Sequence, residues 1–333
     1  MIQNPSVEAS ELRQFRLQNQ QGASVCVLNF GARLTELNIP TRRYGTINTI
    51  LGFDHPETYL QDAMFHGAIA GRYCNRIGDA RFTLNGKVFE LPANNGKHHL
   101  HGGHGFADRI WQLQEKAEHY VVLTLSSEDG DQGYPGNLSV ELRYLLNDDN
   151  GLEVQWRARS DQDTIVGLTN HSYFNLAGHG DISSHQLRIA ADHYTPVDAE
   201  LIPTGEIAPV ENTVFDLRQL HSLAPCLNGE IAALQATDGF DHNWARGRSG
   251  AMLPSAELYC PDSELRLLVS STLPGIQCYT GNALGKTGFH GSHEGICLET
   301  QFYPDSPNQT GFPSPVLKAG ETMAHTTLFQ FSD

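Results

Sequence analysis

The chain has 333 residues, and its 22 Lys and Arg against 38 Asp and Glu give a formal net charge of −16 with every histidine neutral. Nucleic acids and anionic membranes bind clustered positive charge, so this balance argues against both as the main partner. Hydrophobic residues at 39% and charged residues at 18% are typical of a folded globular chain with an ample core.

The amino-terminal residues are polar and acidic, whereas a secretory signal has a basic start and an apolar run of ~7–15 residues. No stretch approaches the ~18 apolar residues that span a bilayer. The six cysteines are scattered, and none forms a C-x-x-C pair. We therefore expect a cytoplasmic protein with reduced, mostly structural thiols.

Alternating apolar and polar residues, which indicate strands with one buried face, dominate the chain. Residues 81–89 and 138–159 each predict a hairpin whose Asn-Gly pair tolerates the positive φ of a tight turn. Residues 217–227 are the best helical candidate, and Pro225 limits that helix to a short piece. Further strands are expected at 120–125 and 186–189, with a third hairpin over 255–269.

Strands that follow strands without intervening helices predict an all-β fold, a large antiparallel β-sandwich with few short helices. The chain shows no internal repeat, no low-complexity tract and no linker-like shift in composition. We therefore expect residues 1–333 to form a single domain.

The densest polar cluster spans residues 94–106, which include four histidines. His99, His101 and His104 are the first candidates for a zinc site, which would activate water or polarise a carbonyl. No downstream Cys or His group has matching ligand spacing, and the flanking glycines favour a loop. Turn histidines that bond the local backbone are the competing interpretation, and His98 belongs to the same set.

Residues 169–176 place His171, Tyr173 and Asn175 on one face of an extended segment. A histidine there would point into a polar cleft, or would be a satisfied side chain on a solvated strand face. For this segment taken alone, a satisfied side chain on a solvated strand face is the stronger interpretation.

Residues 295–304 carry Glu299 within a mostly apolar strand. Desolvation would raise the pKa of this carboxyl above its unperturbed ~4.3 and make it a plausible general base. A glutamate on the wet face of an edge strand remains the alternative. Asp241, in residues 239–244, would similarly fit a turn in which its side chain bonds its own backbone.

Taken together and in this order, seven segments resemble the galactose mutarotases, or aldose 1-epimerases. Each motif is weak alone, but their collinear order from about residue 20 to the end argues against coincidence. The segments are Gly71–Ile77, Leu100–Gly103 with Gly105, Phe106 and Trp111, Asp129–Asn137, Thr169–Leu176, Asp241-His242, Gly275–Asn282, and Leu298–Gln301 with Pro304–Asn308.

The resemblance implies a β-supersandwich without cofactor or metal that interconverts the α and β anomers of free aldoses such as galactose and glucose. Glu299 matches the general base of the family, and His171 matches its general acid. The partner is thus a small sugar, with no nucleic acid or membrane, and we assign no oligomeric state. Positions that hold the oxygens of the sugar match Asn75, Arg76, His101, Asp241 and Gln277.

The chemistry is consistent with those two roles. Anomer exchange breaks the C1–O5 bond, so one group removes the proton of the C1 hydroxyl while another delivers a proton to O5. Each positioned acid or base contributes ~10²–10⁴-fold. An acidic His171 would benefit from a nearby carboxylate that raises its pKa, and paired acid–base catalysis predicts a bell-shaped pH–rate profile.

Three other functions remain open. A phosphorylated-hexose epimerase would need additional Arg or Lys, which the 22 basic residues disfavour. A non-catalytic carbohydrate-binding module would not need both Glu299 and His171. A glycoside hydrolase would use two carboxylates, such as Glu299 with Asp241. The extra histidines near residue 101 leave fine specificity open, and the loop at 289–293 would either line the cleft or lie in solvent.

Overall fold

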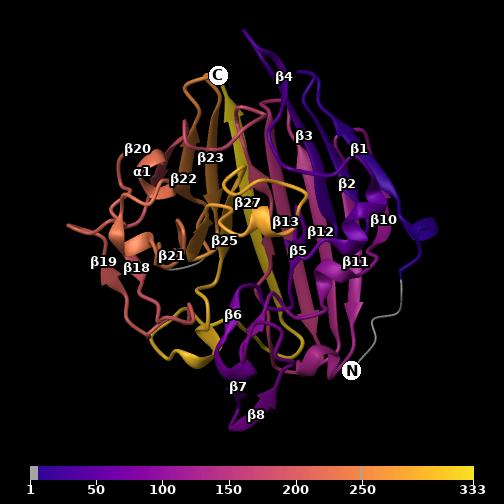
Figure 1. The fold of residues 1–333 in the computed structure, drawn as a ribbon. Helices are drawn as coiled ribbons and strands as arrows, with labels where there is room; N and C mark the ends of the chain where they lie inside the picture. Colours follow the sequence, from indigo (N-terminus) through magenta and orange to yellow (C-terminus); the bar gives the residue numbers. More distant parts are fainter. Residues whose placement is uncertain (1–6, 248–249) are drawn as a thin grey trace.

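The computed structural model describes residues 7–247 and 250–333, and antiparallel strands dominate it (Figure 1). The largest sheet has nine strands. In spatial order they are β10 (Gln112–Lys116), β11 (Tyr120–Ser127), β12 (Leu138–Leu146), β13 (Gly151–Ser160), β27 (Thr322–Ser332), β23 (Arg266–Ser271), β22 (Leu253–Tyr259), β17 (Gln186–Ile189) and β20 (His221–Ser222).

Two smaller sheets complete the main architecture. The six-stranded sheet has the order β16 (Tyr173–Phe174), β25 (Ile296–Gln301), β24 (Gly275–Tyr279), β21 (Asp241–Ala245), β18 (His193–Thr195) and β19 (Ala208–Pro209). The four-stranded sheet has the order β1 (Gln14–Gln18), β2 (Ser24–Leu28), β3 (Arg33–Thr41) and β4 (Gly45–Asn48).

Four short strand pairs in the described chain form separate two-stranded sheets. They are β5 (Ile69–Ala70) with β15 (Thr169–Asn170), β6 (Arg76–Ile77) with β9 (His99–Leu100), β7 (Arg81–Leu84) with β8 (Lys87–Glu90), and β14 (Thr164–Ile165) with β26 (Val316–Leu317).

The predicted hairpins are confirmed. β12 and β13 pair around a turn in which Asn150 has φ +61°, and β7 and β8 pair around Asn85 and Gly86, both at positive φ. β22 and β23 form the third hairpin, and β17 has the expected bounds. Local alternation and turn chemistry therefore suffice for these elements.

The helix expected at residues 217–227 is much shorter in the structure. It is a single turn, α1 (Ala224–Leu227), with Pro225 at its start, while residues 221–222 form strand β20. Proline is tolerated in a first helical turn because it has no N–H to donate. The 3₁₀ turns are η1 (Ala9–Glu11), η2 (Pro56–Gln61), η3 (Gly78–Ala80), η4 (Phe106–Asp108), η5 (Asp131–Gly133), η6 (Ala232–Leu234), η7 (Leu284–Lys286) and η8 (Ser306–Asn308).

The hydrophobic core lies between the sheets. Alternate residues of β12 are buried, and Tyr144 on that face donates a hydrogen bond to the carbonyl of Ala32 beside the four-stranded sheet, at 2.7 Å. The rings of Phe174 on β16 and Phe329 on β27 lie 5.1 Å apart and join the six-stranded sheet to the nine-stranded one. Stacked antiparallel sheets with interdigitating inner faces are a β-sandwich, as the sequence predicts.

Within the described ranges, no helix has the length and apolar character that crossing a bilayer demands.

Candidate active site

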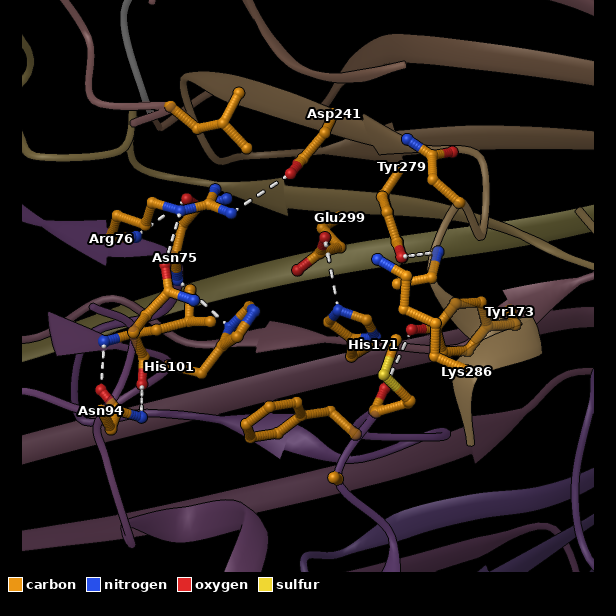
Figure 2. A pocket seen from close by; sticks show the side chains of 18 of the residues that line it. Asn75, Arg76, Asn94, His101, His171, Tyr173, Asp241, Tyr279, Lys286 and Glu299 are labelled. Carbon is orange, nitrogen blue, oxygen red and sulfur yellow. Dashed lines mark hydrogen bonds and ion pairs between the residues drawn. The ribbon is translucent and has the colours of Figure 1, made fainter. Parts of the chain in front are cut away.

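A cleft of about 1480 Å³ opens beside the six-stranded sheet, well above the ~300 Å³ of a small ligand pocket. Side chains from distant parts of the chain converge on it, and Figure 2 shows them facing a common space. Six of the seven residues expected from the sequence line it: Asn75, Arg76, His101, His171, Asp241 and Glu299.

Glu299 lies on β25, between β16 and β24 in the interior of the six-stranded sheet. The wet edge-strand alternative is therefore wrong. Glu299 is 2% exposed, and its Oε2 has no hydrogen-bond partner among the residues that the structure describes. Burial raises the pKa of this carboxyl well above its usual value, the charge of Asp241 adds to the rise, and Arg76 opposes it. The carboxyl is thus poised to bind a proton.

His171 follows β15 and precedes β16, and its Nε2 lies 3.7 Å from Oε1 of Glu299 (Figure 2). Burial lowers the pKa of the imidazole to about 4. The expectation that a nearby carboxylate raises this pKa is therefore wrong, because desolvation outweighs the attraction of Asp62 and Asp241. Burial favours the neutral form of both side chains, so across neutral pH the pair holds one proton between them.

Asp241 opens β21 and forms part of a charged pair at the cleft, not a turn closed on its own backbone. Its Oδ2 lies 3.3 Å from Nη2 of Arg76, and its Oδ1 accepts a 2.6 Å hydrogen bond from Nε2 of Gln277. Gln277 is buried and is not among the residues lining the cleft. The hydrogen bond from Gln277 thus fixes the orientation of Asp241, and Arg76 and Asp241 form a charged pair in the cleft lining.

His101 has a defined tautomer. Its Nδ1 accepts a 3.2 Å hydrogen bond from the backbone N–H of Asn75, so the proton of the neutral ring is on Nε2. Both residues have positive φ, +53° and +61°, which brings the amide and the ring together. Burial lowers the pKa of His101 well below its usual value, and the neighbouring His171 and Arg76 add to that effect. His101 is therefore a neutral hydrogen-bond donor.

The same geometry bears on metal binding. Across residues 7–247 and 250–333, the group suited to a metal ion is His101, His171 and Glu299, with donor atoms within 4.8 Å of one another. A histidine that binds a metal through Nε2 carries its proton on Nδ1 and donates it to an acceptor. Nδ1 of His101 instead accepts a hydrogen bond from the amide N–H of Asn75, so it carries no proton to donate. The donor set therefore does not fit a neutral-imidazole metal site.

The zinc site considered at His99, His101 and His104 is not assembled. Nδ1 of His99 lies 2.7 Å from the carbonyl of Pro92, and Nδ1 of His104 lies 3.1 Å from Asp108 at the surface. Nδ1 of His98 accepts the backbone N–H of Asp79 at 3.0 Å. These histidines bond their local surroundings, which is the competing interpretation drawn from the sequence.

The structure also places two other segments that the sequence analysis considered. Asn175 does not line the cleft with His171 and Tyr173; its Nδ2 donates to the carbonyls of Gly180 and Glu294 and so ties loops together. The loop at 289–293 is also outside the cleft lining, and its Phe289 packs on Phe53 with ring centroids 4.9 Å apart.

Sequence reasoning missed three side chains that bear on the site. Asp62 and Lys286 line the cleft, the latter from η7, and Cys297 contacts His171 from β25. No local pattern singles out Asp62 or Lys286. The period of two in β25 does place Cys297 on the same face as Glu299, and this signal was available.

A family model described as aldose 1-epimerase matches residues 13–330. The galactose mutarotase of Rattus norvegicus is 42% identical over 329 residues, covering 96% of this chain and 94% of that protein. The aldose 1-epimerase of Escherichia coli K12 is 37% identical over 332 residues, covering 96% and 95%. The crystal structure of galactose 1-epimerase from Lactobacillus acidophilus matches with a TM-score of 0.85 at 31% identity, covering 96% and 94%.

The antiparallel sheets and these similarities thus define a carbohydrate-isomerising class of β-sandwich enzymes. The chain belongs to the aldose 1-epimerase family and is an epimerase that acts on the anomeric carbon of aldoses.

Proposed function

We propose that this enzyme interconverts the α and β anomers of free aldohexoses such as galactose and glucose, with Glu299 as general base and His171 as general acid. The observation that carries the proposal is the buried Oε2 of Glu299, which lacks a hydrogen-bond partner in the described chain, in a carboxyl that lies 3.7 Å from Nε2 of His171.

The reaction follows from these positions. The proton that the pair shares first moves from Glu299 to Nε2 of His171, which leaves Glu299 as a carboxylate. This carboxylate takes the proton of the C1 hydroxyl, the C1–O5 bond breaks, and O5 receives the proton on Nε2 of His171. The open-chain aldehyde rotates about C1–C2. On reclosure O5 attacks the other face of C1 and returns its proton to His171, while Glu299 returns its proton to the aldehyde oxygen. Protons and bonds balance over the cycle, and each group contributes ~10²–10⁴-fold.

The remaining cleft residues hold the sugar. His101 donates from Nε2, Arg76 offers a guanidinium, Asp241 accepts from hydroxyl groups, and Asn75 offers an amide. Gln277 acts indirectly: its Nε2 donates a 2.6 Å hydrogen bond to Oδ1 of Asp241 and so fixes that carboxylate. A positioned sugar lowers the entropic part of the barrier, because its anomeric hydroxyl and O5 are held next to the acid–base pair.

Polarimetry on freshly dissolved α-galactose tests the assignment. Glu299→Gln and His171→Asn each remove one proton-transfer group, so we expect rate losses of ~10²-fold or more with the fold intact by circular dichroism. Matched controls are Glu153→Gln on β13 and His193→Asn on β18, both outside the cleft lining. A wild-type rate in either cleft variant would overturn its assigned role.

A comparison of sugars tests the substrate. Lys286 adds one cation to the cleft lining, the feature that a phosphorylated substrate would use. We nevertheless propose the free sugar, because the other cleft cation, Arg76, is already paired with Asp241. We expect α-galactose to react faster than α-glucose 6-phosphate, and the reverse order would favour the phosphorylated sugar.

We further propose that residues 1–333 form a single domain in the cytoplasm, without nucleic-acid or membrane partners. The pairing of β27 with both β13 and β23 supports one unit, since these strands come from the middle and the end of the chain. The net charge of −16 supports the absence of anionic partners. A single cooperative unfolding transition by two probes is expected, and two separated transitions would contradict the one-domain proposal.

A further inference from the structure

One strand contacts both nitrogens of the His171 ring. Nε2 lies 3.7 Å from Oε1 of Glu299, and Nδ1 lies 3.5 Å from Sγ of Cys297. Cys297 and Glu299 are two residues apart on β25, so both side chains leave the same face of the strand, about 7 Å apart along it. The imidazole of His171 lies between the two side chains, with Nε2 toward Glu299 and Nδ1 toward Cys297. Cys297 is fully buried and also pairs in register with Tyr173 of β16, the strand that follows His171.

We propose that Cys297 is a positioning residue for His171: its sulfur accepts the proton of Nδ1, so Nε2 is the nitrogen that exchanges a proton with the ring oxygen of the sugar. The inference rests on the proposed role of His171 as general acid. Cys297 itself touches no reacting atom, and it acts by fixing which nitrogen of His171 faces Glu299 and the sugar.

The requirement for such a partner follows from the catalytic cycle. After His171 gives its Nε2 proton to O5, its remaining proton is on Nδ1. A buried N–H without an acceptor costs about 1–3 kcal/mol, and the sulfur of Cys297 is in contact with this nitrogen. Before catalysis the same tautomer leaves Nε2 unprotonated and 3.7 Å from the protonated carboxyl of Glu299, which agrees with one proton shared by the pair.

A thiol also differs from the partner found at another buried imidazole. Nδ1 of His66 lies 2.9 Å from the carboxylate of Asp62, a strong charged acceptor. A carboxylate at Nδ1 of His171 would stabilise the imidazolium and make it a weaker acid. Sulfur is a weak, uncharged acceptor. Cys297 therefore orients His171 while leaving its proton easy to release to O5.

His101 and His171, whose ring centroids lie 5.1 Å apart in the cleft, consequently have opposite tautomers. His101 keeps its proton on Nε2 because the amide of Asn75 donates to its Nδ1. His171 keeps its proton on Nδ1. His101 can only donate a hydrogen bond to the sugar, whereas His171 can exchange a proton at Nε2. This difference separates holding the substrate from acid catalysis.

Nitrogen-15 NMR of the full-length, histidine-labelled enzyme tests the inference without an activity assay. In the empty protein at neutral pH we expect a protonated Nδ1 and an unprotonated Nε2 for His171, with the opposite pattern for His101 as an internal reference. A protonated Nε2 on neutral His171 would overturn the proposal, because the thiol would then be the donor.

Variants of Cys297 supply the second measurement. In Cys297→Ala we expect a mixture of His171 tautomers and a kcat about 10-fold lower, with KM changed much less, because orientation and not sugar binding is lost. Cys297→Ser keeps an acceptor, so we expect it to restore one tautomer and most of kcat. An alanine variant with the wild-type tautomer and kcat would overturn the proposal.

Cys278→Ala is the matched control. Cys278 is an equally buried thiol on the adjacent strand β24, paired with Leu298, and belongs to the hydrophobic core. We expect it to lower stability without altering the tautomer of His171. If His171→Asn leaves mutarotation unchanged, the proposed acid role fails, whereas the tautomer measurement on the wild type still decides the positioning role of Cys297.

Discussion

Asp62 and Glu299 are two buried carboxylates in one cleft with opposite surroundings. Asp62 accepts from Nη1 of Arg33 at 2.5 Å, from the backbone N–H groups of Met64 and His66, and contacts Nδ1 of His66 at 2.9 Å. Burial alone would raise its pKa, yet these partners hold the pKa well below its usual range. Glu299 has an unpartnered oxygen within the described chain, and burial raises its pKa.

The comparison shows that burial alone does not make a carboxylate reactive. The number of donors aimed at the carboxylate decides whether it stays ionised and inert or remains ready to take a proton. The lone pairs of Asp62 accept hydrogen bonds from Arg33, His66 and the backbone. Oε2 of Glu299 accepts no hydrogen bond within the described chain, so its lone pairs are available to a hydroxyl group of the substrate. The first carboxylate stabilises the walls of the cleft, and the second is proposed to perform its chemistry.

Acidification gives the largest expected effect on stability, because several buried imidazoles contribute to it together. Burial lowers the pKa of six histidines to about 4 or well below the usual value, and it lowers that of the half-buried His290 as well. Below the unfolded value of about 6.5 the unfolded chain therefore binds more protons, and stability falls as pH decreases. Each of the six contributes about 1 kcal/mol between pH 7 and 5.5, and urea unfolding at these two pH values measures the sum. An unchanged midpoint would contradict neutral burial. The six histidines are His99, His101, His171, His185, His242 and His325.

Asp62→Asn is expected to have the next largest effect. It removes the charge that Arg33 and His66 share, which leaves a buried guanidinium without its counter-ion. Breaking a buried pair costs about 3–5 kcal/mol of unfolding free energy, measurable by urea denaturation. The surface variant Asp54→Asn is the control. A loss no greater than in that control would show that the Asp62 cluster does not stabilise the fold.

Glu299→Gln is expected to change stability in the opposite direction. Replacing the carboxyl by a neutral amide removes a group that the folded protein disfavours in its charged form, so at pH 7 we expect an unfolding free energy about 1–2 kcal/mol higher although activity is lost. Thermal denaturation beside the wild type measures the change. A clear decrease in melting temperature would mean that Glu299 has stabilising partners when ionised.

The pH–rate profile gives the smallest expected effect near neutrality. Catalysis needs one shared proton on Glu299 and His171, so kcat/KM should fall below about pH 4, where His171 in the folded enzyme binds a second proton. It should fall again on the alkaline side, where the shared proton is lost from the pair. A rate, followed by polarimetry, that stays constant as the pH is lowered from about 5 to about 3 would contradict the shared-proton model.

The sequence was most informative where structure is local. Alternation and an Asn-Gly turn were enough to predict β12 and β13, because both strands are long and half-buried. The two-residue strands that carry Arg76 and precede His171 have no period to detect. They form because distant segments offer them partners, and local propensity does not encode that choice.

The candidate site was only partly accessible for the same reason. His171 and Glu299 are 128 residues apart in sequence, and their approach depends on the pairing of β16 with β25. Residue chemistry alone left a solvent-facing position open for each of them. The family resemblance was what assigned both to one site. The tautomer of His101 depends on one backbone amide of Asn75 at positive φ, a detail that composition and spacing do not carry.

Strand β27 has a consequence for how the protein is made. It lies between β13 and β23 in the nine-stranded sheet, although it is the last strand of the chain. Until the ribosome has released residues 322–332, the two halves of that sheet face each other with open edges, which are sites for aggregation. Newly made chains therefore depend on the insertion of residues 322–332 between two strands made earlier, and a premature stop upstream of them would yield an aggregation-prone product instead of a weakened enzyme.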